Sequence, residues 1–140
     1  MAFHILTIDD SATMRSVIKK IIRLSGLDVG TYFEACNGKE ALEILSSNWI
    51  DVLLVDINMP VMDGIEFLKS MNQDDLARTI PVVMVTTEGR GPKVEEALKL
   101  GARAHVKKPF RPEEIKQVLM NVMGVDDAGK IQEELEGCDF

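Results

Sequence analysis

Polar side chains that could bind a metal ion or a phosphoryl group follow four separate apolar runs of this sequence. Asp9 and Asp10 follow residues 5–8, Asp56 follows residues 52–55, Thr86 follows residues 82–85, and Lys108 follows the run at residues 104–106. Each residue alone has an ordinary explanation, because carboxylates cap helices and lysine keeps its ammonium in water. For Asp10 and Ser11 taken alone, helix capping is the better explanation. Their coincidence at four run ends favours one shared site.

The chemistry of such a site follows from its charges. Three carboxylates held close together repel one another unless a cation lies between them. Mg²⁺ prefers oxygen ligands and few carboxylates, so it fits this set. Mg²⁺, an ammonium group and a hydroxyl are what a phosphoryl group needs, since charge grows on its oxygens during transfer. An aspartate can accept that group and become an acyl phosphate.

Other catalytic arrangements are not apparent. The sequence has no GxxxxGK[ST] loop for a nucleotide and no Ser-His-Asp or Cys-His pairing, so the phosphoryl donor must come from another molecule. Cys36 and Cys138 stand far apart without histidines at ligand spacing, which argues against a zinc site.

The elements that must position these residues alternate between strands and helices. Short apolar runs at residues 5–8, 31–33, 52–55, 82–85 and 104–106 are each followed by a helical pattern. Capping residues stand before three of the helical patterns (Ser11, Asn37 with Glu40, Asp63 with Glu66). Pro92 and Pro112 suit a first helical turn, and Gly101 suits a helix end. This alternation predicts an α/β fold, a three-layer sandwich around a parallel five-stranded sheet. Sites in such sheets form at the carboxyl ends of the strands.

Length and charge limit the function. The 140 residues suit one domain, and the net charge of −7 argues against a nucleic-acid partner. No signal peptide or apolar run of membrane-spanning length is apparent, so we expect no membrane association and a cytoplasmic location. Residues 126–140 hold six acids and one base, and we expect the acidic tail at residues 125–140 to be a short helix or disordered.

Four segments together resemble the receiver domain of bacterial response regulators. They are Asp9-Asp10-Ser11, the stretch from Asp56 to Gly64, Val85-Thr86-Thr87, and Lys107-Lys108-Pro109-Phe110. The resemblance covers about residues 3–123 and is strongest to stand-alone chemotaxis receivers of the CheY type. It implies a receiver domain at residues 1–124 with the flavodoxin-like strand order 2-1-3-4-5.

The resemblance also implies roles for individual residues. Asp56 matches the phosphoacceptor, Asp10, Asp56 and the Asn58 backbone carbonyl match Mg²⁺ ligands, and Asp9 matches the acid that holds the ion through water. Lys108 matches the lysine that pairs with the phosphoryl oxygens, ahead of an expected cis bond to Pro109. Thr86 matches the switch hydroxyl, and Gly64 matches a turn where a side chain would obstruct. Asn58 and Glu88 match positions that tune dephosphorylation.

One residue departs from the CheY pattern. His105 stands on the fifth predicted strand, where CheY carries a tyrosine as its rotameric switch. The histidine could swing inward behind Thr86, or it could be a surface residue of an edge strand. Phosphorylation is expected in either case.

The implied function is that of a signalling switch and not of an enzyme beyond its own phosphorylation and dephosphorylation. A histidine kinase of the CheA type would phosphorylate Asp56. The fourth helix, fifth strand and fifth helix would then bind the flagellar motor switch, and a phosphatase could reset the signal. The alternative is a receiver in a phosphorelay with another output.

Two alternative functions belong to other classes of protein, an enzyme and a cofactor-binding protein. A phosphatase of the haloacid dehalogenase type would carry DxD after its first strand and would usually need a cap, whereas this chain has Asp9-Asp10-Ser11 and no long insertion. A flavodoxin-like cofactor binder would need a Ser/Thr-rich loop there and aromatic residues to hold the ring, but Trp49 is the only tryptophan.

Overall fold

The predicted alternation of strands and helices is confirmed by the structure, a computed structural model that describes residues 2–59, 62–87 and 91–124. In chain order, the elements of these residues are β1 (Phe3–Ile8), α1 (Ala12–Leu24), β2 (Val29–Ala35), α2 (Gly38–Ser47), β3 (Val52–Asp56), α3 (Gly64–Met71), η1 (Ala77–Thr79), β4 (Val82–Thr86), α4 (Pro92–Lys99), β5 (Ala104–Lys107) and α5 (Pro112–Met123). The strands are parallel in the order β2-β1-β3-β4-β5, as expected.

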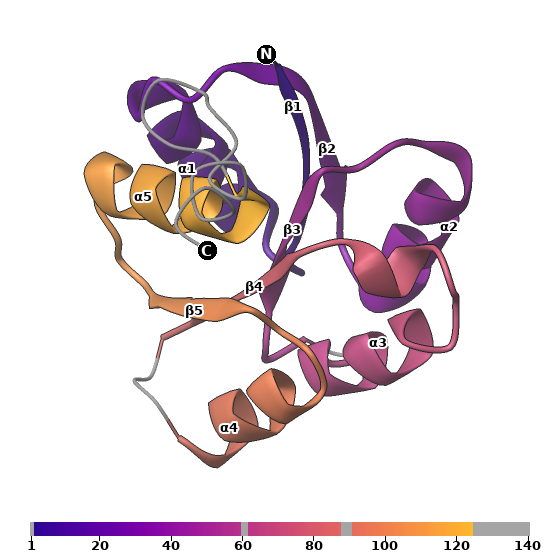
Figure 1. Ribbon diagram of the computed structural model, residues 1–140. Helices are drawn as coiled ribbons and strands as arrows, with labels where there is room; N and C mark the ends of the chain where they lie inside the picture. Colours follow the sequence, from indigo (N-terminus) through magenta and orange to yellow (C-terminus); the bar gives the residue numbers. More distant parts are fainter. Residues whose placement is uncertain (1, 60–61, 88–90, 125–140) are drawn as a thin grey trace, which may run out of the picture.

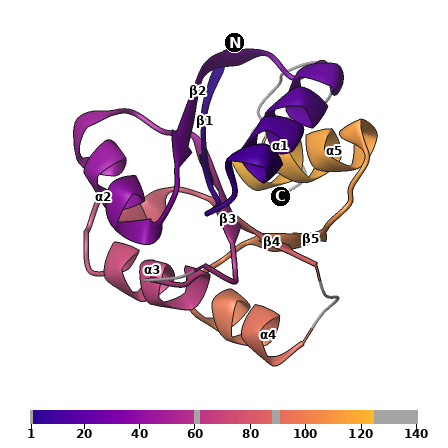
Figure 2. The same ribbon diagram turned by 180° about the vertical axis from the view of Figure 1, so that it is seen from behind.

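Helices cover both faces of the sheet (Figures 1 and 2). α1 and α5 lie on one face, while α2, α3 and α4 lie on the other. Side chains of β3 alternate between the two resulting cores: Leu53 and Val55 pack with the second group of helices, and Val52 and Leu54 pack with the first. Every residue of β3 and β4 is buried. This burial on both faces explains why the two runs are continuously apolar.

The helices begin where the capping residues predict. The side chains of Ser11, Asn37 and Asp63 each accept a hydrogen bond from the backbone N–H three residues later. Pro92 and Pro112 open α4 and α5, where a missing N–H costs nothing. At α2 the structure departs from the expected reciprocal capping box, because the Glu40 carboxylate accepts from the N–H of Cys36, the residue before the cap.

Other parts of the chain differ from the predictions, were not predicted, or lie outside the described residues. β2 covers Val29–Ala35, longer than the apolar run at 31–33, because this edge strand pairs with β1 alone and tolerates exposed polar residues such as Glu34. The turn η1 was not predicted. None of the helices in the described parts has the length and apolar character that a bilayer crossing requires. The prediction for the tail at 125–140 lies outside the described residues.

Candidate magnesium and phosphoryl site

The carboxyl edge of the sheet brings the polar residues of four strands together. Asp56 is the last residue of β3 and Thr86 the last of β4, while Asp9 and Lys108 follow directly after β1 and β5. The strand register aligns these ends. Asp56 of β3 pairs with Val85 of β4, and Thr86, which follows Val85, pairs with Lys107 at the end of β5. The structure therefore gathers the residues that the sequence places at strand ends, and their chemical roles remain predictions.

Three carboxylates form the centre of this site. One oxygen from each of Asp9, Asp10 and Asp56 lies within 4.8 Å of the others. Asp9 and Asp56 are buried, with 2% and 8% of their surface exposed, whereas Asp10 is exposed and opens the cluster to solvent. Hard oxygen donors with one side open to water are the ligand set that Mg²⁺ prefers, since this ion keeps several waters. The residues present fit a magnesium ion.

Lys108 contributes the positive charge of the site. Its Nζ lies 3.1 Å from Asp9 Oδ2 and 3.9 Å from Asp56 Oδ1, and its side chain is only 11% exposed. The backbone N–H of Lys108 donates to the Thr86 carbonyl at 2.7 Å, which ties this loop to the end of β4. The bond between Lys108 and Pro109 is cis, as expected from the resemblance.

The sequence left open whether Asp10 and Ser11 only cap a helix or belong to the shared site, and the structure gives the two residues different contacts. Ser11 caps α1 through its hydroxyl, and its backbone N–H donates to Asp9 Oδ1 at 2.9 Å. Asp10 belongs to the carboxylate cluster. The capping explanation is therefore correct for Ser11, whereas a role of Asp10 as a metal ligand stays a prediction.

Gly64 lies where a side chain would meet the backbone of the acceptor strand. A Cβ atom at this residue would stand 2.7 Å from the Asp56 carbonyl oxygen and 2.9 Å from the Cα of Ile57. The N–H of Gly64 also donates to the Ile57 carbonyl at 2.9 Å. The predicted obstruction is confirmed, because α3 begins in direct contact with the strand that ends at Asp56.

Two residues at the rim of the site show a contact that the sequence did not predict. The N–H of Asn58 donates to Asp56 Oδ1 at 3.3 Å, and its side-chain oxygen accepts from Lys93 Nζ at 3.0 Å. Lys93 lies in the first turn of α4, so this contact joins the acceptor loop to the fourth helix. The sequence could not have identified Lys93, because it lies in no motif and a long surface lysine side chain can reach several different neighbours.

The remaining predicted residues have separate outcomes. Thr86 is 3% exposed at the end of β4. His105 is half-buried on the edge strand β5 beside Met84 of β4, so both alternatives for its role stay predictions. Glu88 lies outside the described residues.

Burial raises the pKa of Asp56 from 3.8 to about 6. Desolvation is the main cause, the ammonium of Lys108 opposes it, and the carboxylate of Asp9 adds to it. The ionised form of the Asp56 carboxyl is therefore held at a cost in free energy near neutral pH. A cation in the cluster would reduce that cost.

Replacing Asp56 with asparagine is expected to stabilise the metal-free protein at neutral pH. Because the pKa of Asp56 is higher in the folded state, its favourable contribution is complete below about pH 4 and is lost as the pH rises through about 6. The neutral amide should therefore raise the free energy of unfolding by about 1–3 kcal/mol near pH 7.5 and by little near pH 4. Urea denaturation in excess chelator measures this difference.

A matched control is Asp75→Asn, since the Asp75 side chain is 94% exposed and distant in sequence from the cluster. It should leave the free energy of unfolding nearly unchanged at both pH values. An Asp56→Asn protein that is less stable than the wild type near pH 7.5 would contradict a buried, costly charge at this residue.

Comparisons with known proteins agree on one family. The family model for the response regulator receiver domain matches residues 5–120. The chain is 41% identical to chemotaxis protein CheY1 of Helicobacter pylori over 88% of this chain and 98% of that protein. It is 40% identical to a chemotaxis protein CheY homolog of Campylobacter jejuni over 86% and 92% of the two chains. Among solved structures, chemotaxis protein CheY4 of Vibrio cholerae matches with a TM-score of 0.78 and 32% identity over 87% of this chain and 99% of that one.

Proposed function

Because the chain belongs to the response regulator receiver family and is a CheY-type receiver domain, we propose that Asp56 accepts a phosphoryl group from a histidine kinase and that this modification switches partner binding. One observation carries the proposal: the buried Asp56 carboxylate ends a central strand, beside two further carboxylates and the Lys108 ammonium. We place the receiver unit at residues 1–124 and the protein in the cytoplasm, where a kinase of this class would meet it.

The transfer needs little from the protein beyond positioning and charge. A carboxylate oxygen of Asp56 attacks the phosphorus of a phosphohistidine; an O–P bond forms, the N–P bond breaks, and the imidazole keeps the electron pair and takes up a proton. Lys108 lies close enough to Asp56 to pair with a phosphoryl oxygen. Bound Mg²⁺, held by Asp9, Asp10, Asp56 and the Asn58 carbonyl, would offset the charge that grows on the phosphoryl oxygens.

The switch follows from contacts that differ between the two states. A phosphoryl group on Asp56 gives Thr86 and Lys108 new acceptors, and both residues belong to segments next to α4, β5 and α5. Differential contacts of this kind bias a two-state equilibrium, and a nearly complete shift requires about 5 kcal/mol. His105 lies half-buried on β5, so we propose that its side chain moves together with Thr86.

We propose chemotaxis as the output, with a CheA-type kinase upstream, the flagellar motor switch downstream and a phosphatase that shortens the signal. The relatives named as chemotaxis proteins support this choice. His105, in place of the tyrosine expected there, favours a second candidate, a receiver in another phosphorelay. Beryllofluoride mimics an acyl phosphate, so pull-down of a motor switch protein with and without it distinguishes the two. If beryllofluoride did not change the amount of motor switch protein bound, the result would argue against the flagellar motor as the output.

Replacing Lys108 with arginine is expected to preserve phosphorylation and to weaken the conformational response. The larger planar guanidinium cannot take the position of an ammonium held between Asp9 and Asp56, so the phosphorylated state should lose about 1–3 kcal/mol of its coupling to the partner face. Hydrogen exchange of α4 and β5 with beryllofluoride and Mg²⁺ measures this response. The change in protection should be smaller in Lys108→Arg than in the wild type.

The matched control is Lys107→Arg, because Lys107 is an exposed neighbour at the end of β5. It should respond as the wild type does. If Lys108→Arg showed the full change in protection, Lys108 would have no part in the switch.

A further inference from the structure

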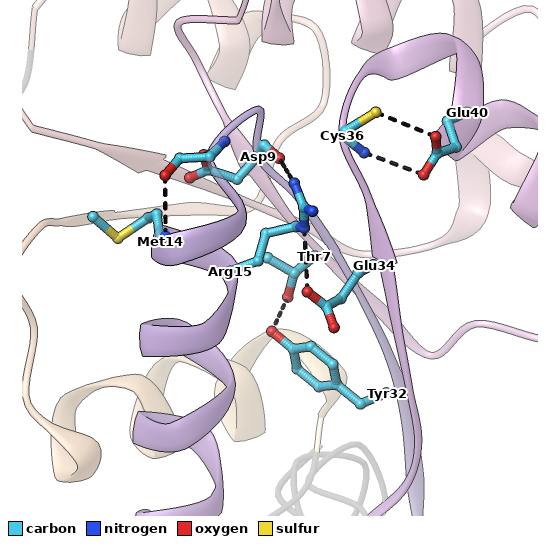
Figure 3. A network of polar contacts seen from close by, with 9 residues as sticks. Thr7, Asp9, Met14, Arg15, Tyr32, Glu34, Cys36 and Glu40 are labelled. Atoms are coloured by element: carbon cyan, nitrogen blue, oxygen red, sulfur yellow. Dashed lines mark hydrogen bonds and ion pairs between the residues drawn. The ribbon is translucent and has the colours of Figure 1, made fainter.

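Arg15 bridges two segments of the fold beside the site (Figure 3). Its Nη1 donates to the backbone carbonyl of Asp9 at 2.6 Å, and its Nε donates to Glu34 Oε1 at 3.2 Å. The Arg15 side chain is only 16% exposed. Glu34 lies on β2, a strand that supplies none of the proposed ligands. An arginine anchored on β2 therefore contacts the loop that carries two of the three carboxylates.

Asp9 is fixed at each of its four polar atoms. Its N–H donates to the Ala35 carbonyl at 3.1 Å, and its carboxylate accepts from the Ser11 N–H and from Lys108 Nζ. The fourth atom, the carbonyl oxygen, is the one that Arg15 holds. This carbonyl belongs to the peptide between Asp9 and Asp10. Because a peptide unit is planar, holding its oxygen also restricts the direction in which Asp10 leaves the strand.

We propose that Arg15 is a positioning residue for the magnesium site, acting through the Asp9–Asp10 peptide and anchored by Glu34. The inference rests on the proposed function, because it concerns the same carboxylates. Arginine suits the role because its planar group carries several donors in fixed directions, so one side chain can hold the Asp9 carbonyl and the Glu34 carboxylate together. A lysine has one compact ammonium and reaches only one of them well. Residues that orient metal ligands commonly change metal affinity without touching the ion.

The direct test is Mg²⁺ titration of the full-length chain by calorimetry, with no phosphoryl donor present. Arg15→Gln should weaken Mg²⁺ binding by about tenfold. Arg15→Lys should recover part of the affinity. Urea denaturation of the same samples reports stability, and a merely structural role would lower stability while leaving the Mg²⁺ affinity of the folded protein unchanged.

A second variant tests the anchor and keeps the inference testable if Arg15→Gln fails to fold. Glu34 is 36% exposed, so Glu34→Ala should be tolerated, and it should also weaken Mg²⁺ binding although Glu34 is not a ligand. The two substitutions together should cost less than the sum of their separate effects, because they break one chain of contacts. Additive effects would show that Glu34 does not act through Arg15 and would overturn the proposed anchor.

The matched control is Arg23→Gln, which removes the same charge from an exposed position in the last turn of the same helix. Its Mg²⁺ affinity should stay within about twofold of the wild type. Wild-type affinity in both Arg15→Gln and Glu34→Ala would overturn the inference and leave the proposed function intact. A wild-type protein that binds no Mg²⁺ would instead overturn both.

Discussion

Asp56→Asn is expected to abolish covalent labelling of the protein by acetyl phosphate and by a histidine kinase. An amide oxygen is a poor nucleophile, and the substitution replaces the proposed acceptor while keeping its size. The loss should exceed about a thousandfold, since removal of a covalent nucleophile has effects of this order. Radiolabelled acetyl phosphate with Mg²⁺, followed by gel separation and phosphorimaging, measures the label.

Two controls make this result specific to the acceptor. Asp75→Asn removes an exposed carboxylate of the same type and should keep full labelling. Asp56→Asn should remain folded, because it removes a buried charge whose pKa is raised by desolvation. A folded Asp56→Asn protein that is labelled as strongly as the wild type would mean that another residue is the acceptor.

The gathering of the site could be predicted because strand ends fix positions. A side chain directly after a buried parallel strand must lie at the carboxyl edge of the sheet. Asp9 and Lys108 satisfy this rule although they stand 99 residues apart along the chain, and Asp56 lies at the same edge as the last residue of β3. The continuous apolar runs at residues 52–55 and 82–85 specified β3 and β4, since both faces of these two strands are buried. Backbone topology alone therefore brings these groups together.

The supporting contacts could not be predicted, because they depend on where long side chains turn after packing. Arg15 and Glu34 are 19 residues apart, on elements whose spacing is set by α1 packing on the sheet. Lys93 and Asn58 are 35 residues apart, and their contact joins the first turn of α4 to the loop after β3. No periodic pattern or motif in the sequence indicates that the residues of either pair are in contact. The sequence therefore predicts the carboxylates themselves better than the residues that orient them.

The raised pKa of Asp56 connects the fold to the chemistry. The packing that buries the end of β3 also removes water from the acceptor carboxylate, and Lys108 compensates only in part, because it lies nearer to Asp9 than to Asp56. The site thus holds more negative charge than its own cation balances. A bound divalent ion would supply the missing charge, so the proposed phosphorylation and metal binding should depend on each other.

Removal of Mg²⁺ is accordingly expected to abolish phosphorylation of Asp56 by acetyl phosphate. Without a divalent cation, three carboxylates with oxygens within 4.8 Å of one another repel an approaching phosphate dianion, and the Lys108 ammonium is already paired with Asp9. Labelling in excess EDTA should fall to background and should return when Mg²⁺ exceeds the chelator. Sodium chloride of equal ionic strength should not restore it, because a monovalent ion cannot replace the charge and oxygen coordination of Mg²⁺.

Asp10→Asn refines this test, because Asp10 is the exposed member of the cluster and can be changed with little effect on packing. The variant should need more than about tenfold higher Mg²⁺ for half-maximal labelling, since one charged ligand becomes a neutral amide. Asp75→Asn should keep the wild-type Mg²⁺ requirement. Labelling that persists in EDTA, or an Asp10→Asn protein with an unchanged Mg²⁺ requirement, would show that the carboxylates at the ends of β1 and β3 do not act together as a metal site.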